Sequence, residues 1–198
     1  MVVSSRMIRN TLLITALILM FGLHTGCSYT ILSFSAPPDP PCPIEGLLLD
    51  VSLFPGEGWE EIGPRDAQGA PSRKGIERIG TSFSTPTKGV AIQHIYRFWD
   101  SREARKGYTD LVNTWFSSRE GETDWLTPPD LAEFSTNADQ FRLACNIHLL
   151  SGVERCQYIA QYEPYVIEFS TDMLALSHED FIELVREIDQ RVTSCLGQ

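Results

Sequence analysis

The sequence predicts a single α+β domain in which an antiparallel sheet of about five to six strands is covered by two amphipathic helices. Several short runs alternate apolar and polar residues with the period of two that a half-buried strand requires. Two longer segments repeat apolar residues at three- and four-residue spacing, the signature of a one-faced helix. Short turns join most of the strands, so neighbouring strands are expected to run antiparallel.

The first half of the domain is expected to supply three strands and one helix. A strand is expected at 46–54, and a surface loop rich in Gly, Pro and charge should follow at 55–75. A hairpin should pair 76–84 with 90–99, and a helix should span 101–118. The helix carries its apolar residues on one face: Ala104, Tyr108, Leu111, Val112 and Trp115.

The second half is expected to form a meander and a closing helix. A loop at 120–137 should lead into strands at 140–150, 153–162 and 165–171. The last helix should start after Ser177, and its apolar stripe is Phe181, Leu184, Val185, Ile188 and Val192. This arrangement is similar to the antiparallel α/β sandwiches of photosystem PsbP-like proteins and of some extracytoplasmic sensor domains, a likeness of fold that implies no activity.

The N-terminus has the features of an export signal. Two arginines are the only charges among the first ten residues, and an apolar run at 11–23 is shorter than a spanning helix needs. The small residues Thr25 and Gly26 then precede Cys27. This pattern resembles the signal segment of bacterial lipoproteins, although His24 stands where that family usually has leucine. The resemblance implies that residues 1–26 are removed and that Cys27 carries lipid.

Two alternatives stay open for this segment. Conventional cleavage after Ser35 would release the domain without lipid. The segment could also stay uncut, because the 24 residues at 11–34 contain only His24, Cys27 and Tyr29 as ionisable groups and suffice to span a bilayer. Arginines on the N-terminal side would then leave the rest outside. We expect an extracytoplasmic, membrane-anchored protein of the cell envelope.

A proline-rich spacer at 27–44 should hold a globular domain at 45–198 away from the membrane, at about 3 Å per residue. The formal net charge is −10; two of the 16 basic residues lie in the signal segment, so the exported part has 14 basic against 26 acidic residues, or −12. A body this acidic repels phosphate backbones, so nucleic acid is excluded as a partner.

The cysteines predict two disulfides. If Cys27 takes a lipid, four cysteines remain, an even number suited to an oxidising compartment. Cys145 and Cys156 lie on consecutive expected strands and can face each other across a hairpin. That leaves Cys42 for Cys195, a bridge that would join the two ends of the domain. Metal binding by these cysteines is the rival interpretation, but the sequence has no Cys-x-x-Cys pair.

No motif of catalysis or cofactor binding is present. The exported part lacks a Gly-x-Ser-x-Gly elbow and a His-Glu-x-x-His helix. His94, His148 and His178 could in principle form a metal or acid–base site, but isolated strand histidines are more often structural. His178 is expected to be exposed on the first turn of the last helix. We therefore predict no catalytic residue, no cofactor and no metal.

The tryptophans in the two long loops are the remaining candidates for ligand contact. Trp59 and Trp125 lie where aromatic side chains often serve binding, or else seal the edges of the core. The function expected is that of a binding or accessory domain for a protein or small-molecule ligand. The alternatives are an exported hydrolase that uses His94 or His148 with a carboxylate, and a passive envelope component with neither pocket nor exposed apolar patch.

Overall fold

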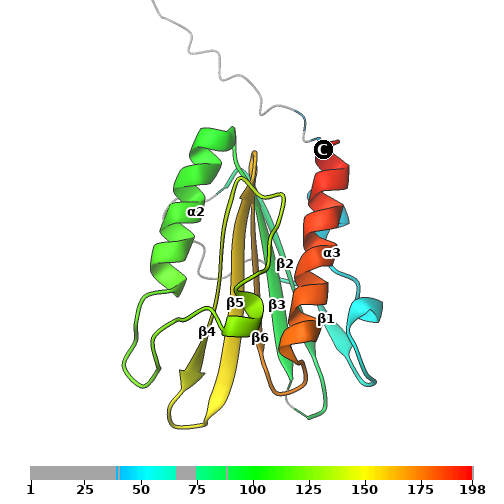
Figure 1. Ribbon diagram of the computed structural model, residues 1–198. Helices are drawn as coiled ribbons and strands as arrows, with labels where there is room; N and C mark the ends of the chain where they lie inside the picture. The colour runs from blue at the N-terminus through cyan, green and yellow to red at the C-terminus, as the bar shows by residue number, and fades with distance from the viewer. Residues whose placement is uncertain (1–38, 40, 66–74, 88, 198) are drawn as a thin grey trace, which may run out of the picture. The chain divides into compact units, whose positions relative to one another are not determined.

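A computed structural model describes residues 39, 41–65, 75–87 and 89–197 (Figure 1). All of these belong to one compact unit, residues 37–198. The signal segment, Cys27 and most of the spacer lie outside the described residues, so their roles stay predictions. Within the described ranges no helix combines the length and apolar character needed to cross a membrane.

The unit is built on one antiparallel sheet of six strands in the order β1-β2-β3-β6-β5-β4. The elements follow one another as η1 (Ile44–Leu47), η2 (Val51–Leu53), β1 (Glu60–Arg65), β2 (Glu77–Ser84), β3 (Val90–Arg97), α2 (Ser101–Trp115), η3 (Pro129–Leu131), β4 (Gln140–His148), β5 (Val153–Tyr162), β6 (Tyr165–Asp172) and α3 (His178–Leu196). The predicted α+β class, with a six-stranded antiparallel sheet and two amphipathic helices, is confirmed.

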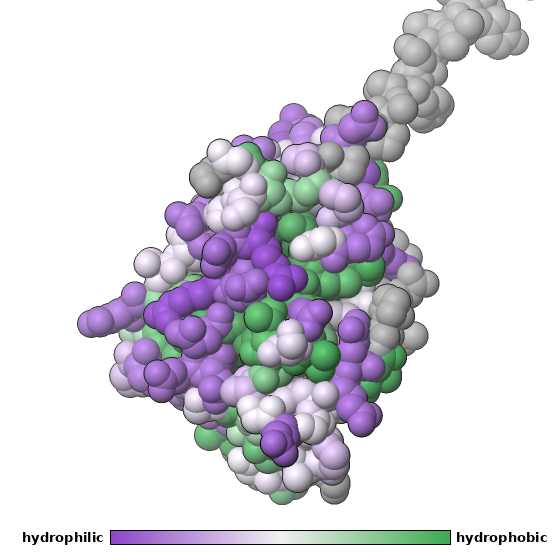
Figure 2. Space-filling view, turned by 90° about the vertical axis from the view of Figure 1, so that its right-hand side faces the viewer, coloured by the Kyte–Doolittle hydropathy of each residue, from purple (hydrophilic) through white to green (hydrophobic). Residues whose placement is uncertain are grey.

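The two α-helices cover opposite faces of the sheet (Figure 1). Alternate residues of β5 show the division: Tyr158 and Ala160 pack in the core beneath α3, whereas Ile159 packs beneath α2. Side chains alternate along a strand, so each central strand contributes to two separate cores. The result is a three-layer domain with the sheet in the middle. Figure 2 shows the α3 side, where hydrophilic side chains lie beside apolar areas.

The strand expected at 46–54 is absent, and this prediction was wrong. The segment instead forms the 3-10 turns η1 and η2. Its backbone bonds to a side chain rather than to a strand: Leu49 N–H donates to Gln93 Oε1 at 2.7 Å, and Gln93 Nε2 donates to the Leu47 carbonyl at 3.2 Å. The first strand of the sheet is β1, which lies within the expected loop at 55–75 and pairs with β2.

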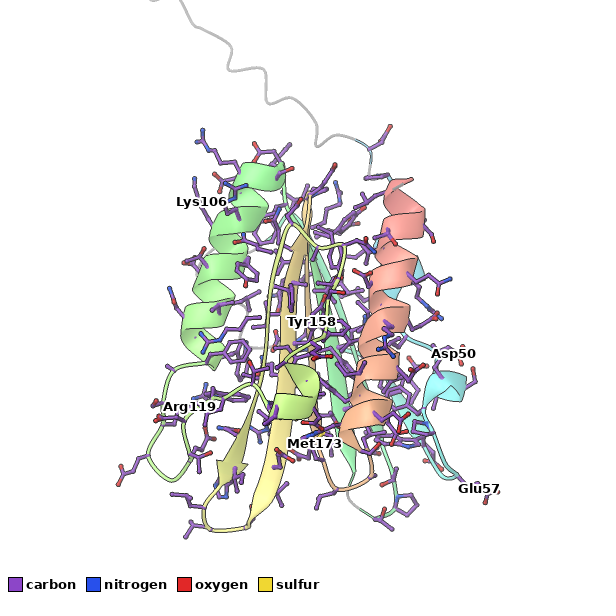
Figure 3. All side chains as sticks on the ribbon, in the orientation of Figure 1. Asp50, Glu57, Lys106, Arg119, Tyr158 and Met173 are labelled. Atoms are coloured by element: carbon purple, nitrogen blue, oxygen red, sulfur yellow. A yellow bond between two sulfur atoms is a disulfide. The ribbon has the colours of Figure 1, made fainter. Side chains whose placement is uncertain are left out.

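A hydroxyl network beneath α3 joins that helix to the sheet. Tyr158 lies between β5 and α3 (Figure 3), and its hydroxyl is 2.8 Å from that of Tyr162. Tyr162 donates to Asp189 Oδ1 of α3 at 2.9 Å, and Asn137 Nδ2 donates to the other carboxylate oxygen at 2.7 Å. One carboxylate thus holds a helix, a strand and the loop before β4 together. These bonds satisfy polar groups that would be costly to bury alone.

The outer edge of β4 is covered by the loop that follows α2. Leu126 and Cys145 exchange backbone hydrogen bonds of 2.9 and 2.8 Å, and Thr123 N–H donates to the Ile147 carbonyl at 3.0 Å. An open strand edge is a template for pairing with another chain, and this loop occupies it.

The four described cysteines form the two pairs that the spacing predicts. Cys42 is bonded to Cys195 near the end of α3, with Cα atoms 5.9 Å apart. Cys145 and Cys156 face each other in the register of β4 and β5, with Cα atoms 4.1 Å apart. The first bridge joins the two ends of the described domain, and the second joins two adjacent strands.

Replacing Cys42 and Cys195 together by alanine is expected to lower the free energy of unfolding by about 5 kcal/mol, since the bridge closes a loop of 153 residues in the unfolded chain. Urea denaturation of the wild type and the double variant measures the loss. Ser194→Ala, at the exposed neighbour of Cys195, is the control and should change stability by less than about 0.5 kcal/mol. A loss below about 1 kcal/mol for the double variant would contradict the prediction.

Candidate functional site: a polar pocket beneath helix α2

The face of the sheet beneath α2 contains a buried carboxylate. Glu168 of β6 is 3% exposed. Tyr96 donates its hydroxyl to Glu168 Oε2 at 3.3 Å, and Gln157 Nε2 donates to Oε1 at 3.2 Å. His94 Nδ1 lies 3.5 Å from Oε2. Burial of a carboxylate is tolerated only where polar groups replace its water, and Tyr96 and Gln157 do so here by hydrogen bonds. His94 approaches the carboxylate, but its Nδ1 makes no hydrogen bond within the described structure.

Strand register explains how these residues meet. His94 of β3 lies opposite Glu168 in the β3–β6 ladder, and Gln157 of β5 lies opposite Ser170, the next residue of β6 on the same face. The residues come from three strands, and β3 is far in sequence from β5 and β6. Burial, and after it the negative charge of Glu168, raises the pKa of Tyr96 well above its usual range. The phenol therefore stays a neutral donor to the carboxylate.

A pocket of about 210 Å³ continues from this carboxylate along the same face. Gln157 belongs to both, because it lines the pocket while donating to Glu168. The full lining is Val90, Ile92, Trp115, Arg155, Gln157, Ser170, Thr171 and Asp172. The pocket thus combines an apolar wall with a guanidinium, a carboxylate, an amide and the Ser170 hydroxyl. The side chain of Thr171 faces α3, and its hydroxyl donates to the Val90 carbonyl.

Two of the lining side chains have unused hydrogen-bond donors. Arg155 donates from Nε to Asp172 Oδ1 at 3.2 Å, and its terminal nitrogens have no partner among the described residues; the side chain is 41% exposed, so these nitrogens are open to solvent or to a ligand. The indole nitrogen of Trp115 is buried and unpaired within the described part of the chain. An unpaired buried donor costs free energy unless a ligand or water accepts from it.

A second pocket, of about 370 Å³, shares the Arg155–Asp172 pair with the first. His148 lines this second pocket, and its Nδ1 lies 3.1 Å from the Ser151 hydroxyl. The two pockets therefore flank one ion pair. A third pocket, of about 410 Å³, lies elsewhere, between η1 and the end of α3.

The three predicted histidines do not come together. His94 lies on β3 and His148 on β4, so two strands separate them, and three strand spacings amount to about 14 Å. His178 lies on α3, which covers the opposite face. The expectation that His178 is exposed was wrong: its side chain is 24% exposed and lies between Asp130 and Glu154, at 2.7 and 3.3 Å.

The two loop tryptophans pack against other aromatic rings. Trp59 lies against Phe54, with ring centroids 4.7 Å apart, and donates to the Pro55 carbonyl. Trp125 is 8% exposed and meets the edge of Phe116. Neither lines any of the three pockets. The tryptophan in the pocket is Trp115, which helical periodicity had assigned only to the buried stripe of its helix.

The comparisons with known proteins support the fold alone. No protein-family model and no curated protein matches the chain. Among solved structures, the chain is similar to the extracellular domain of PknH from Mycobacterium tuberculosis, with a TM-score of 0.55 and 13% sequence identity. The match covers 76% of this chain and 95% of that domain.

Glu168→Gln is expected to lower the free energy of unfolding by about 1–3 kcal/mol, because the amide oxygen can accept from only one of Tyr96 and Gln157 and the amide nitrogen faces the other donor. Urea denaturation monitored by circular dichroism measures the change. Glu133→Gln, at an exposed loop residue, is the matched control and should be nearly neutral. Equal effects of the two substitutions would show that Glu168 does not depend on its buried partners.

Proposed function

We propose that this chain is an extracytoplasmic, membrane-anchored binding or accessory domain that takes up a small carboxylate-bearing solute beneath α2. Two disulfides support an oxidising compartment, since such bonds are rare in reducing ones. The likeness to an extracellular domain agrees with that location. The signal-like segment ending at Cys27 supports lipid attachment of the protein to the envelope membrane.

The observation that carries the binding proposal is the pair of unused donors in the pocket beneath α2. The terminal nitrogens of Arg155 present a planar fork, the geometry that suits a carboxylate. Trp115 adds an indole N–H and an aromatic surface. Asp172, beside Arg155, supplies an acceptor for an ammonium or hydroxyl group of the same solute.

The size of the pocket favours a metabolite over a larger ligand. Its volume of about 210 Å³ lies below the range of about 300–1,000 Å³ that is typical of sites for drug-sized molecules. A free amino acid or a short-chain carboxylic acid has both the size and the groups that this lining would recognise. The adjoining pocket beyond Arg155 leaves room for a substituent.

The two alternative functions have less support. A hydrolase could use the His94–Glu168 pair, but this pair lines none of the three pockets, and no described hydroxyl or thiol is hydrogen-bonded to His94. A passive component would lack exposed apolar residues as well as pockets. Here Leu149, Leu150 and Leu174 are 62%, 91% and 54% exposed.

A panel of free amino acids and short mono- and dicarboxylates tests the binding proposal. At about a hundred times its dissociation constant, a bound member should stabilise the protein by about 2.7 kcal/mol, which raises Tm by roughly 5–10 °C. Arg155→Gln should abolish the shift. Arg186→Gln, at an exposed arginine of α3, should preserve it. A panel without any hit, or a hit that survives Arg155→Gln, would refute this site.

Cys27→Ser tests the anchor separately. The wild-type protein should fractionate with membranes and incorporate radioactive fatty acid, and the variant should lose the label. A variant that stays in the membrane without label would support an uncut helix at 11–34 instead. Release of both proteins into the medium would favour conventional cleavage without an anchor.

A further inference from the structure

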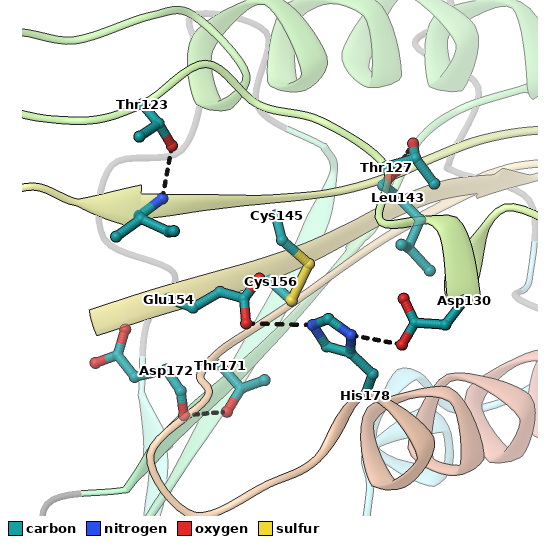
Figure 4. Close-up of a disulfide and its surroundings, with 11 residues drawn as sticks. Thr123, Thr127, Asp130, Leu143, Cys145, Glu154, Cys156, Thr171, Asp172 and His178 are labelled. Atoms are coloured by element: carbon teal, nitrogen blue, oxygen red, sulfur yellow. Dashed lines mark hydrogen bonds and ion pairs between the residues drawn. A yellow bond between two sulfur atoms is a disulfide. The ribbon is translucent and has the colours of Figure 1, made fainter. Parts of the chain in front are cut away.

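We propose that the dithiol form of the β4–β5 hairpin holds one zinc ion through Cys145, Cys156, Glu154 and His178. This site lies beneath α3, on the opposite face of the sheet from the pocket described above. It is independent of the proposed binding function. In the disulfide form shown in Figure 4 the two sulfurs are bonded to each other and carry no thiolate charge. The zinc site and the disulfide are therefore alternative states of the same two cysteines.

The ligand atoms are already gathered in one place, and reduction of the disulfide would let the two sulfurs separate to the spacing that zinc requires. One ligand atom from each of the four residues lies within 4.8 Å of all the others. Bonds of about 2.0–2.3 Å to a tetrahedral zinc ion separate its ligand atoms by about 3.3–3.8 Å. His178 Nε2 and Glu154 Oε2 are 3.3 Å apart. Two thiolates, one imidazole and one carboxylate are all established zinc ligands.

The orientation of His178 also fits a metal ligand. Its Nδ1 lies 2.7 Å from Asp130 Oδ2. Its Nε2 is buried and makes no hydrogen bond of good geometry in the described structure, and the Glu154 carboxylate approaches it as an ion-pair partner at 3.3 Å. Figure 4 shows the ring held between the two carboxylates, with Nε2 on the side of Glu154 and the disulfide. A zinc-bound histidine characteristically donates its other ring nitrogen to a carboxylate, which fixes the tautomer and the ring orientation. Asp130 is placed to do this.

The fold brings these groups together by register and by helix capping. Cys145 lies opposite Cys156 in the β4–β5 ladder, and Glu154 precedes Cys156 by two residues, so both face α3. His178 is the first residue of α3, and the capping box formed by Ser177 fixes the start of that helix. Both cysteines are buried, at 4% and 0% exposure, which limits access of competing water.

The two states interconvert by a balanced thiol–disulfide exchange. One zinc-bound thiolate attacks a disulfide of an oxidant protein, which breaks the oxidant's sulfur–sulfur bond and forms a mixed disulfide. The second thiolate then attacks the mixed disulfide, so that the Cys145–Cys156 bond forms and the second oxidant sulfur is displaced. The two electrons of the dithiolate pass to the oxidant, whose sulfurs take up two protons and leave as thiols. Zinc is released because it has lost two of its four ligands.

Cobalt titration of the full-length protein in detergent tests the proposal, with the protein kept reduced by a phosphine under nitrogen. The reduced wild type should bind one equivalent and show the visible bands of tetrahedral cobalt with sulfur-to-cobalt charge transfer, and zinc should displace the cobalt. His178→Gln should weaken binding by at least about tenfold, and Asp130→Asn by about 10–100-fold, although both variants keep every cysteine. His148→Gln, on β4 like Cys145 but on the opposite face of the sheet, is the control and should bind as the wild type does.

Several outcomes would overturn the site. The site is refuted if the reduced wild-type chain takes up no cobalt, whether or not the chain remains folded. The site is also refuted if the wild type and His178→Gln bind cobalt with equal affinity, because the metal would then be held by cysteine thiols alone. If the oxidised protein binds cobalt with the same affinity as the reduced protein, the metal does not need the Cys145–Cys156 dithiol and the proposal is refuted. If circular dichroism shows that His178→Gln is unfolded, Glu154→Gln takes its place with the same expected loss.

Discussion

The pairing of β3 with β6 is the contact on which the rest of the structure depends. It joins the hairpin of β2 and β3 to the meander of β4, β5 and β6, and so makes one sheet from two halves of the chain. Seven residues of each strand are in register, from Ala91 opposite Thr171 to Arg97 opposite Tyr165. Because side chains alternate, this single register also decides which residues meet α2 and which meet α3.

Buried polar groups are satisfied in different ways on the two faces of the sheet. Beneath α3, Asp189 accepts hydrogen bonds from Tyr162 and Asn137 and so fastens the helix. Beneath α2, Glu168 accepts from donors on neighbouring strands, and farther along the buried indole nitrogen of Trp115 stays unpaired within the described residues, beside the partly exposed Arg155. Saturated networks stabilise a fold, whereas unsatisfied donors in a pocket leave free energy for a ligand to recover. This difference is why we place ligand binding under α2.

Strand β5 contributes residues to both proposed sites, because its side chains point alternately to the two faces of the sheet. Glu154 and Cys156 face α3 and belong to the zinc proposal, while Arg155 and Gln157 face α2 and line the pocket. Oxidation of the hairpin and binding of a solute would therefore act on adjacent residues of one strand. The second disulfide, between Cys42 and Cys195, acts elsewhere, by joining the two ends of the described domain.

The sequence by itself determined the elements whose signal is local: two one-faced helices, the hairpin, the meander and the pairing of Cys145 with Cys156. Periodicity and short turns depend on residues a few positions apart, so they can be read from the sequence without knowledge of the fold. Only the tertiary structure decided that 46–54 bonds to the Gln93 side chain instead of forming a strand. It also decided that Trp115, rather than Trp59 or Trp125, lines a pocket. Glu168 meets Tyr96 and His94 only because β3 pairs with β6, and no local pattern encodes which of two strands distant in sequence will be adjacent.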